Sequence, residues 1–262
     1  MKKILLYALL ITNCALLFVG CGFNSNEREK LIIGIDDEFA PMGFRDEGGN
    51  IVGFDVDLAK EAAARMDVEL EFVPILWDNK EKEITSGNID MIWNGCDIME
   101  EYKNYMTFSE PYMDNRQILL VRKSNTQGIH NLNDLKDKVV GTQSGSNSED
   151  YVEENPDLKN SFDEFKTYRN IKEGFTALND KKCDVLIIDE IAARYEIIRK
   201  PATFEIIDLT VGPVTEFGIG FRKDNVELRD RIQKVFDEMI EDGTAKKISM
   251  RWFGSDLVKV HD

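Results

Sequence analysis

Residues 53–95 read GFDVDLAKEAAARMDVELEFVPILWDNKEKEITSGNIDMIWNG. Residues 53–66 carry apolar side chains near helical spacing and acids in the first turn, so they are predicted to form a helix. Alternating apolar residues at 69–75 predict a strand. Residues 79–87 are predicted to form a second helix that stops at Gly87, since glycine favours the backbone conformation that ends helices.

The apolar run that follows, DMIWNG at residues 90–95, predicts another strand, and LIIGID at residues 31–36 predicts one before the first helix. Strands and helices therefore alternate from residue 31 to residue 95. This order is typical of a mainly parallel sheet covered by helices. In such sheets, ligands bind beyond the carboxyl ends of the strands.

The α/β alternation restarts downstream. ILLVRK at residues 118–123 predicts a strand that enters a second unit, and the strands FEIIDL and FGIGFRK precede a helical C-terminal segment broken at Asp242-Gly243. A chain that returns in this way predicts two lobes joined by two crossovers, near Leu119–Arg122 and Glu216–Gly220. The expected division is residues 31–118 plus 218–262 for lobe 1, and residues 119–217 for lobe 2.

The first 22 residues, MKKILLYALLITNCALLFVGCG, have the order of a secretory signal. Lys2 and Lys3 precede an apolar stretch, and small residues precede Cys21. FVGC at 18–21 resembles the lipobox, the cleavage and lipidation site of bacterial lipoproteins, with phenylalanine where leucine is usual. An uncleaved transmembrane anchor is the alternative, but the apolar stretch is of marginal length and is interrupted by Asn13.

The sequence thus predicts a signal peptide at residues 1–20, lipidation of Cys21 and a polar tether at residues 21–30. The mature protein would lie outside the cytoplasm, either anchored by lipid to the outer face of the cell membrane or periplasmic. We expect it to act as a monomer.

Charge and cysteine content exclude several classes of function. The formal net charge is −16, so the chain repels nucleic acid. Cys14 lies in the signal and Cys21 at the lipidation site, which leaves Cys96 and Cys183 in the folded part. These two form no CxxC motif and no metal-ligand spacing, so no metal and no cofactor are expected. Two buried free thiols are favoured over a disulfide between them.

The order of several short motifs resembles a known family. These motifs are GFDVDLAKEAAARM, the loop after residue 93, FSEPY at 108–112, the loop GTQSGS at 141–146, CDVLIID at 183–189 and KKISMRWFG at 246–254. Together with the signal, they resemble the bacterial extracellular solute-binding proteins of the polar amino-acid class (family 3), which capture ligands for ABC importers. The resemblance implies an α/β, two-lobed periplasmic-binding-protein-like fold of type II, with a ligand cleft between the lobes.

The resemblance also implies a set of ligand-binding positions in the cleft. An acid at Asp189 matches the partner of the ligand ammonium, and an acid after a strand can form a charge-assisted pair with an amine. Asn94, Gly95 and Asp97 match the loop that meets the ligand carboxylate. The remaining positions matched to the cleft are Asp36, Phe39, Trp77, Ser146 and Asn147.

Two positions depart from the family pattern. The family usually has Ser or Thr at the place of Asp97, and an Arg that holds the ligand carboxylate at the place of Tyr102. A guanidinium recognises a carboxylate by geometry and charge, and Tyr102 offers one neutral hydroxyl. Asp97 adds a negative charge beside the expected carboxylate position. Asp97 also fits a helix N-cap, and Ser146 fits a capping box at a helix start that could hold an anion.

The leading interpretation is a non-catalytic binding protein whose acids and aromatic rings attract a cationic group. The ligand would be an amino acid or a related cationic amine, delivered to the permease of an ABC transporter. A dehydratase-like enzyme on the same scaffold is an alternative, with Asp97 or Glu100 as proton donor. A ligand-sensing partner of a membrane receptor is another.

Overall fold

The computed structural model describes residues 28–125 and 128–260. Within these ranges no helix has the length and apolar character needed to cross a bilayer. The predicted signal peptide, the alternative membrane anchor and the predicted lipidation of Cys21 lie outside the described residues.

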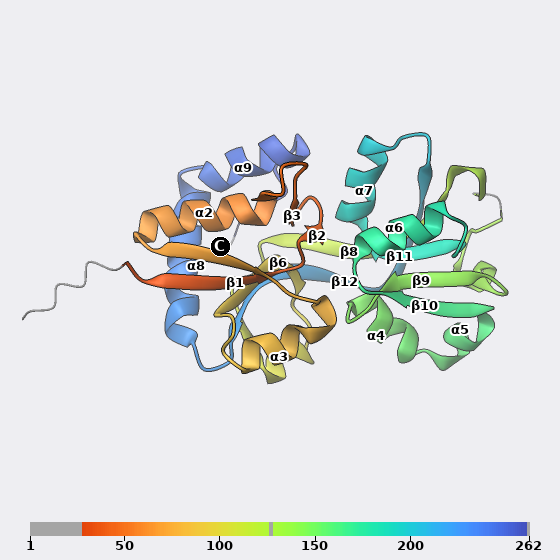
Figure 1. Cartoon of the computed structure of the whole chain (residues 1–262), viewed down its shortest axis with the longest axis horizontal. Helices are drawn as coiled ribbons and strands as arrows, with labels where there is room; N and C mark the ends of the chain where they lie inside the picture. Colours follow the sequence, from red (N-terminus) through yellow and green to blue (C-terminus); the bar gives the residue numbers. More distant parts are fainter. Residues whose placement is uncertain (1–27, 126–127, 261–262) are drawn as a thin grey trace, which may run out of the picture.

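Two lobes stand side by side and share one nine-stranded sheet (Figure 1). Its spatial order is β10 (Glu164–Tyr168), β9 (Val139–Gln143), β11 (Val185–Asp189), β8 (Met113–Arg122), β12 (Phe204–Arg222), β6 (Met91–Asp97), β1 (Lys30–Ile35) and β5 (Glu69–Pro74), with β7 (Met106–Phe108) paired to β12. A small second sheet contains β2 (Glu38–Phe39), β3 (Gly43–Arg45) and β4 (Ile51–Val52).

In the main sheet, three strands of each lobe pair in parallel. In one lobe β1 pairs in parallel with β5 and with β6, and in the other β9 pairs in parallel with β10 and with β11. The predicted parallel sheet is therefore confirmed for each lobe. Between them, β8 and β12 run antiparallel to each other and to their neighbours, because the chain crosses out along β8 and returns along β12.

Helices cover both faces of each lobe (Figure 1). In the first lobe they are α2 (Phe54–Met66), α3 (Lys80–Thr85), α8 (Val226–Glu241) and α9 (Thr244–Phe253). In the second lobe they are α4 (Asn147–Glu153), α5 (Pro156–Ser161), α6 (Ile171–Asn179) and α7 (Glu190–Arg199). Short 3-10 turns lie at Trp77–Asn79, Tyr102–Asn104, Lys123–Asn125 and Leu132–Leu135.

Coverage on both faces explains why the strands read as continuous apolar runs. Successive side chains of a strand point to opposite faces. In β8, Ile118 and Leu120 join one apolar cluster, and Leu119 and Val121 join another on the opposite face. All four side chains of the run ILLV therefore lie in apolar surroundings, and none faces water.

Most elements form where the sequence predicts them, and the differences have local causes. The two last predicted strands are parts of one strand, β12, which is 19 residues long. Helix α7 and the small sheet are not apparent in the sequence, because α7 has little amphipathic pattern and β2 and β4 have two residues each. Cys96 and Cys183 are free and buried, as favoured from the sequence.

The lobe boundaries remain a prediction. In β8, residues from Leu119 onward pair with β11 of the second lobe. In β12, residues up to Ile207 pair with this part of β8, and residues from Phe217 onward pair with β6 of the first lobe. Between them, the register of β12 on β8 shifts twice, between Ile207 and Val211 and between Val211 and Thr215.

Candidate functional site

A small cavity lies where the strand ends of the two lobes meet. The residues that line it are Asp36, Phe39, Trp77, Asn94, Gly95, Asp97, Gln143, Ser146, Asn147 and Asp189. Nine of them are positions predicted from the sequence, Gln143 is an addition, and the predicted Tyr102 is not among them. The cavity volume is about 20 Å³, which is room for about one water molecule. A larger ligand therefore requires the lobes to separate before it enters.

Two carboxylates are held together on one wall of the cavity. Asn115 of β8 donates through Nδ2 to Asp97 Oδ1 at 3.0 Å and to Asp189 Oδ1 at 2.6 Å. Thr215 Oγ1 of β12 donates to Asp97 Oδ1 at 2.5 Å, and Gln117 Nε2 donates to Asp189 Oδ1 at 2.6 Å. Both acids are thus fixed by neutral donors from the two crossing strands.

Burial makes the charge on this pair costly. Burial and, to a lesser degree, the nearby Asp189 carboxylate raise the pKa of Asp97 to about 7, against the hydrogen bonds from Asn115 and Thr215. Burial also raises the pKa of Asp189, against the hydrogen bonds from Asn115 and Gln117. A cation placed between the two carboxylates would offset this cost.

Asp36 joins the two lobes. Gln143 Nε2, at the end of β9, donates to Asp36 Oδ2 at 2.6 Å, and the Glu38 amide donates to Asp36 Oδ1 at 3.0 Å. The second bond stays within the loop of Asp36, and the first crosses to the other lobe. Burial raises the pKa of Asp36 to about 6. Asp36 is therefore a third acid that faces the same closed space.

The loop at Asn94 and Gly95 is committed to internal contacts. Asn94 Oδ1 accepts from the Asp36 amide at 2.8 Å. The Gly95 amide donates to Asp55 Oδ2 at 2.7 Å, and Tyr112 Oη donates to the same oxygen at 2.8 Å. The backbone N–H of Gly95 is consequently already bonded, although the family pattern assigns this loop to the ligand carboxylate.

Asp97 is not a helix N-cap, so that alternative is wrong. It is the last residue of β6, and its carboxylate accepts from Asn115 and Thr215, which are remote in sequence. Ser146 does cap α4, since its Oγ accepts from the Glu149 amide at 3.3 Å. Glu149 Oε2 accepts from the Gly145 amide at 2.6 Å, so the carboxylate of Glu149 already occupies this turn.

Trp77 and Tyr102 flank a buried lysine beside the cavity. Lys80 Nζ lies 5.6 Å from the ring centre of Trp77 and 4.5 Å from that of Tyr102. It donates to the Gly145 carbonyl of the second lobe at 2.6 Å. Tyr102 itself is buried among apolar side chains, and its hydroxyl is 3.5 Å from Asp150 Oδ2.

Sequence reasoning missed Asn115, Gln117, Gln143, Thr215 and Lys80. A signal was present for the first two, because they alternate in MDNRQILL and so share one face of a strand that leads into an apolar run. Thr215 and Gln143 carry no such signal. They reach the acids only because β12 lies beside β8 and β9 faces the first lobe.

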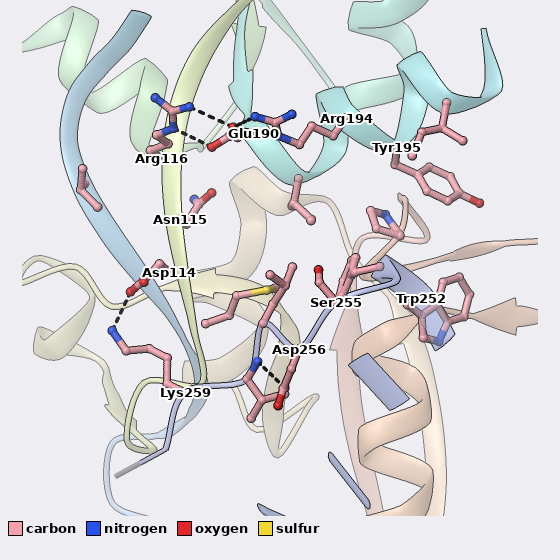
Figure 2. A pocket seen from close by; sticks show the side chains of 18 residues that line it. Asp114, Asn115, Arg116, Glu190, Arg194, Tyr195, Trp252, Ser255, Asp256 and Lys259 are labelled. Atoms are coloured by element: carbon pink, nitrogen blue, oxygen red, sulfur yellow. Dashed lines mark hydrogen bonds and ion pairs between the residues drawn. The ribbon is translucent and has the colours of Figure 1, made fainter. Parts of the chain in front are cut away.

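A larger groove of about 770 Å³ lies along β8, α7 and the C-terminal segment (Figure 2). Its main charges are paired with one another. Arg116 binds Glu190 through Nε at 2.6 Å and Asp208 through Nη2 at 2.7 Å, and Lys259 Nζ lies 2.6 Å from Asp114 Oδ1. The smaller cavity, in contrast, is lined by three acids and by no basic side chain. It is the better candidate for a site that binds a charged ligand.

Comparison with known proteins places the chain in a family. The family model for bacterial extracellular solute-binding proteins, family 3, matches residues 31–255. The arginine-binding extracellular protein ArtP of Bacillus subtilis is 32% identical over 261 residues, covering 97% of this chain and 98% of the relative. The L-cystine-binding protein TcyJ of Escherichia coli K12 is 29% identical over 236 residues, covering 89% and 86%.

A solved structure of a substrate-binding protein is also similar to this chain. An ABC uptake transporter substrate-binding protein from Streptococcus pneumoniae, with bound histidine, has 34% sequence identity and a TM-score of 0.83 over 88% of this chain and 95% of that one. The two-lobed α/β fold and the match over nearly the whole described chain lead to one conclusion. The protein belongs to the bacterial extracellular solute-binding proteins, family 3.

Proposed function

We propose that the protein captures an amino acid or related amine that carries a positive charge, and delivers it to the permease of an ABC importer. It binds its ligand in the small cavity between the lobes and does not transform it. The amino-acid ligands named for its relatives support the ligand class.

One observation carries this proposal. Three carboxylates, Asp36, Asp97 and Asp189, face one cavity whose lining includes no basic side chain. Burial raises the pKa of each of them, so a cationic ligand gains both Coulomb attraction and relief of a desolvated charge. The rings of Phe39 and Trp77 in the same lining provide faces for a cation.

The membrane-anchored form is part of the proposal. The segment FVGC at 18–21 and the charged, apolar and small-residue order before it support lipidation of Cys21. A binding protein tethered in this way would stay close to its permease on the outer face of the membrane. As a soluble monomer without lipid, it would be free to diffuse away.

The dehydratase-like alternative has one supporting observation, the raised pKa of Asp97, which would suit a proton donor. The anionic substrates of such a reaction would meet three acids in the cavity. Incubation with amino acids and cyclic carboxylates, followed by mass spectrometry, separates the two functions. Turnover of any of these compounds would contradict the binding-only proposal.

A thermal-shift screen tests the ligand class directly, because ligand binding to the native state raises the melting temperature. The screen compares cationic, neutral and acidic amino acids and the amines derived from them. Cationic compounds should raise the melting temperature of the domain beginning at residue 28, and acidic ones should not. Stabilisation by glutamate or aspartate alone would contradict the proposal. Ligand uptake by cells that lack the protein separates transport from the ligand-sensing role. Loss of uptake would support transport, and unchanged uptake would favour sensing.

A further inference from the structure

Lys80 is a buried cation beside a site that is otherwise acidic. It is the first residue of α3, and 6% of its surface is exposed. Its ammonium is bonded to a carbonyl oxygen, that of Gly145, and lies over the rings of Trp77 and Tyr102. Within the described ranges it forms no ion pair with a carboxylate. A buried ammonium without a paired anion is costly to retain.

The position of Lys80 connects it to the ligand cavity. Trp77, one turn before it, lines the cavity, and Gly145 directly precedes Ser146, which lines it from the other lobe. The charge of Lys80 also lowers the pKa of Asp97, so it acts on the carboxylate wall of the site. Figure 1 shows α3 and α4 facing each other at the junction of the lobes.

The chemistry of the cavity leaves one role open. Its acids can hold ammonium or guanidinium groups, but its lining residues offer no cation for a carboxylate. The Gly95 amide and the turn at Gly145 are already bonded to Asp55 and Glu149. An ammonium has three N–H donors, and Lys80 uses one on Gly145, so two remain for another acceptor.

We infer that Lys80 binds the ligand carboxylate, and that the ligand is an amino acid with a cationic side chain and not its decarboxylated amine. This inference rests on the proposed function. Asp97 and Asp189 hold the α-ammonium group on one side of the cavity. Asp36, between the lobes, receives the side-chain cation. Lys80 reaches the carboxylate from the edge of the cavity when the lobes have parted and close again around the ligand.

Calorimetry with matched ligand pairs tests this assignment. Arginine is compared with agmatine, lysine with cadaverine and histidine with histamine, since each amine keeps the cations and lacks the carboxylate. The wild-type protein should bind the preferred amino acid roughly 10- to 100-fold more tightly than its amine, the range for a hydrogen bond to a charged group. Lys80→Met should remove that preference by weakening the amino acid much more than the amine, because only the amino acid loses a partner for its carboxylate.

The exposed lysine two positions along α3 supplies the control. Lys82→Met makes the same change on the same helix and should leave both affinities as in the wild type. Retained amine binding by Lys80→Met shows that the variant is folded. Equal weakening of amino acid and amine would assign Lys80 to lobe closure alone and overturn the inference. Equal binding of amino acid and amine by the wild type would also overturn the inference. Failure of the wild type to bind any cationic ligand would instead refute the proposed function.

Discussion

Asp97 shows how neutral neighbours can fix an acid without neutralising it. Its Oδ1 accepts hydrogen bonds from Asn115 and Thr215, and Asp189 accepts one from the same side-chain amide of Asn115. The positive charge of Lys80 only partly offsets the effects of burial and of the Asp189 carboxylate on the pKa of Asp97. The ligand-free site is therefore electrostatically strained, and this strain is available to favour binding of a cation.

Neutralising Asp97 should stabilise the ligand-free protein. Its pKa lies near 7 in the folded protein, above the ordinary 3.8, so the cost of its charge appears as the pH rises from about 4 and is complete above about 7. Asp97→Asn keeps an oxygen acceptor for Asn115 and Thr215. It should increase the free energy of unfolding by up to about 3 kcal/mol at pH 8 and by little at pH 4.

Urea unfolding at a series of pH values measures this effect. Asp36 and Asp55, whose pKa values burial raises to about 6 and about 7, act in the same direction and remain in the variant. Some loss of stability with rising pH should therefore persist. A variant less stable than the wild type at pH 8 would contradict the interpretation.

Asp189 should be the main ammonium partner of the ligand. Its Oδ1 accepts from both Asn115 and Gln117, and Asp189→Asn keeps that acceptor while removing the charge. The change should cost roughly 2–4 kcal/mol of binding free energy, as for a buried charge pair that loses one charge. Calorimetry with the ligand found in the screen measures it. An unchanged affinity would place the ammonium group elsewhere.

At the scale of elements, the end of β6 is held in one conformation by close packing. Gly95 has a φ of +58°, and a Cβ there would lie 2.6 Å from Phe39 Cε1. Asp55, in the first turn of α2, bonds the Gly95 amide and Tyr112. A strand end, a helix start and an aromatic ring of the cavity thus fix one another.

Replacing Gly95 should disturb both stability and binding. Gly95→Ala combines a left-handed backbone with the clash against Phe39. Gly49→Ala is a matched control, because Gly49 has a φ of +80° and no atom within 4 Å of its added Cβ. The control should lose about 1 kcal/mol of stability. Gly95→Ala should lose roughly 1–3 kcal/mol more, and it should bind ligand more weakly. Equal losses of stability for Gly95→Ala and Gly49→Ala in denaturant unfolding would contradict this, because they would show that Phe39 moves aside at no cost in free energy.

At the scale of the whole molecule, we propose that the hinge lies where β8 and β12 lose regular pairing. The register shifts of β12 lie between Ile207 and Thr215, opposite residues 115–119 of β8. Irregular pairing removes ladder hydrogen bonds, so this region should bend more easily than the regular pairing on either side. The candidate site lies beside this proposed hinge, since Asn115 and Thr215 both contact Asp97.

Ligand binding should close the lobes. The cavity in this closed form holds about 20 Å³, so the ligand-free protein must visit a more open form to admit a ligand. Small-angle X-ray scattering should give a smaller radius of gyration with ligand than without it. The Asp189→Asn variant at the same ligand concentration is the control and should stay open. An identical radius with and without saturating ligand would contradict lobe closure.

Membrane attachment should depend on Cys21. In cells that produce the full chain, Cys21→Ser should move the protein from the membrane fraction to the soluble fraction, because a lipid on Cys21 would supply the attachment. Cys14→Ser changes a cysteine inside the predicted signal and serves as the control, which should stay with the membrane. Fractionation with intact-mass measurement gives the answer. Membrane association and mass unchanged by Cys21→Ser would refute lipidation.

The sequence by itself determined the local elements and the strand ends. Apolar runs and helical spacing set β1, α2, β5, α3 and β6, because short-range periodicity reflects which faces are buried. The family resemblance then implied Asp36, Asn94, Asp97 and Asp189, which lie at or near strand ends, as site positions, and these four residues line one cavity. Helix α7 was not predicted, since its residues show little separation of apolar and polar faces.

Tertiary structure alone decided how these residues are used. Asp97 looked like a helix cap in sequence, but in the fold it bonds Asn115 and Thr215, the latter 118 residues away. Lys80 gave no signal in a lysine-rich segment, and only the packing of α3 against the second lobe places its ammonium on Gly145. Hydrogen bonds and charges act over a few ångströms in space, whereas periodicity reports neighbours along the chain. Partners that are distant in sequence are therefore fixed by the fold.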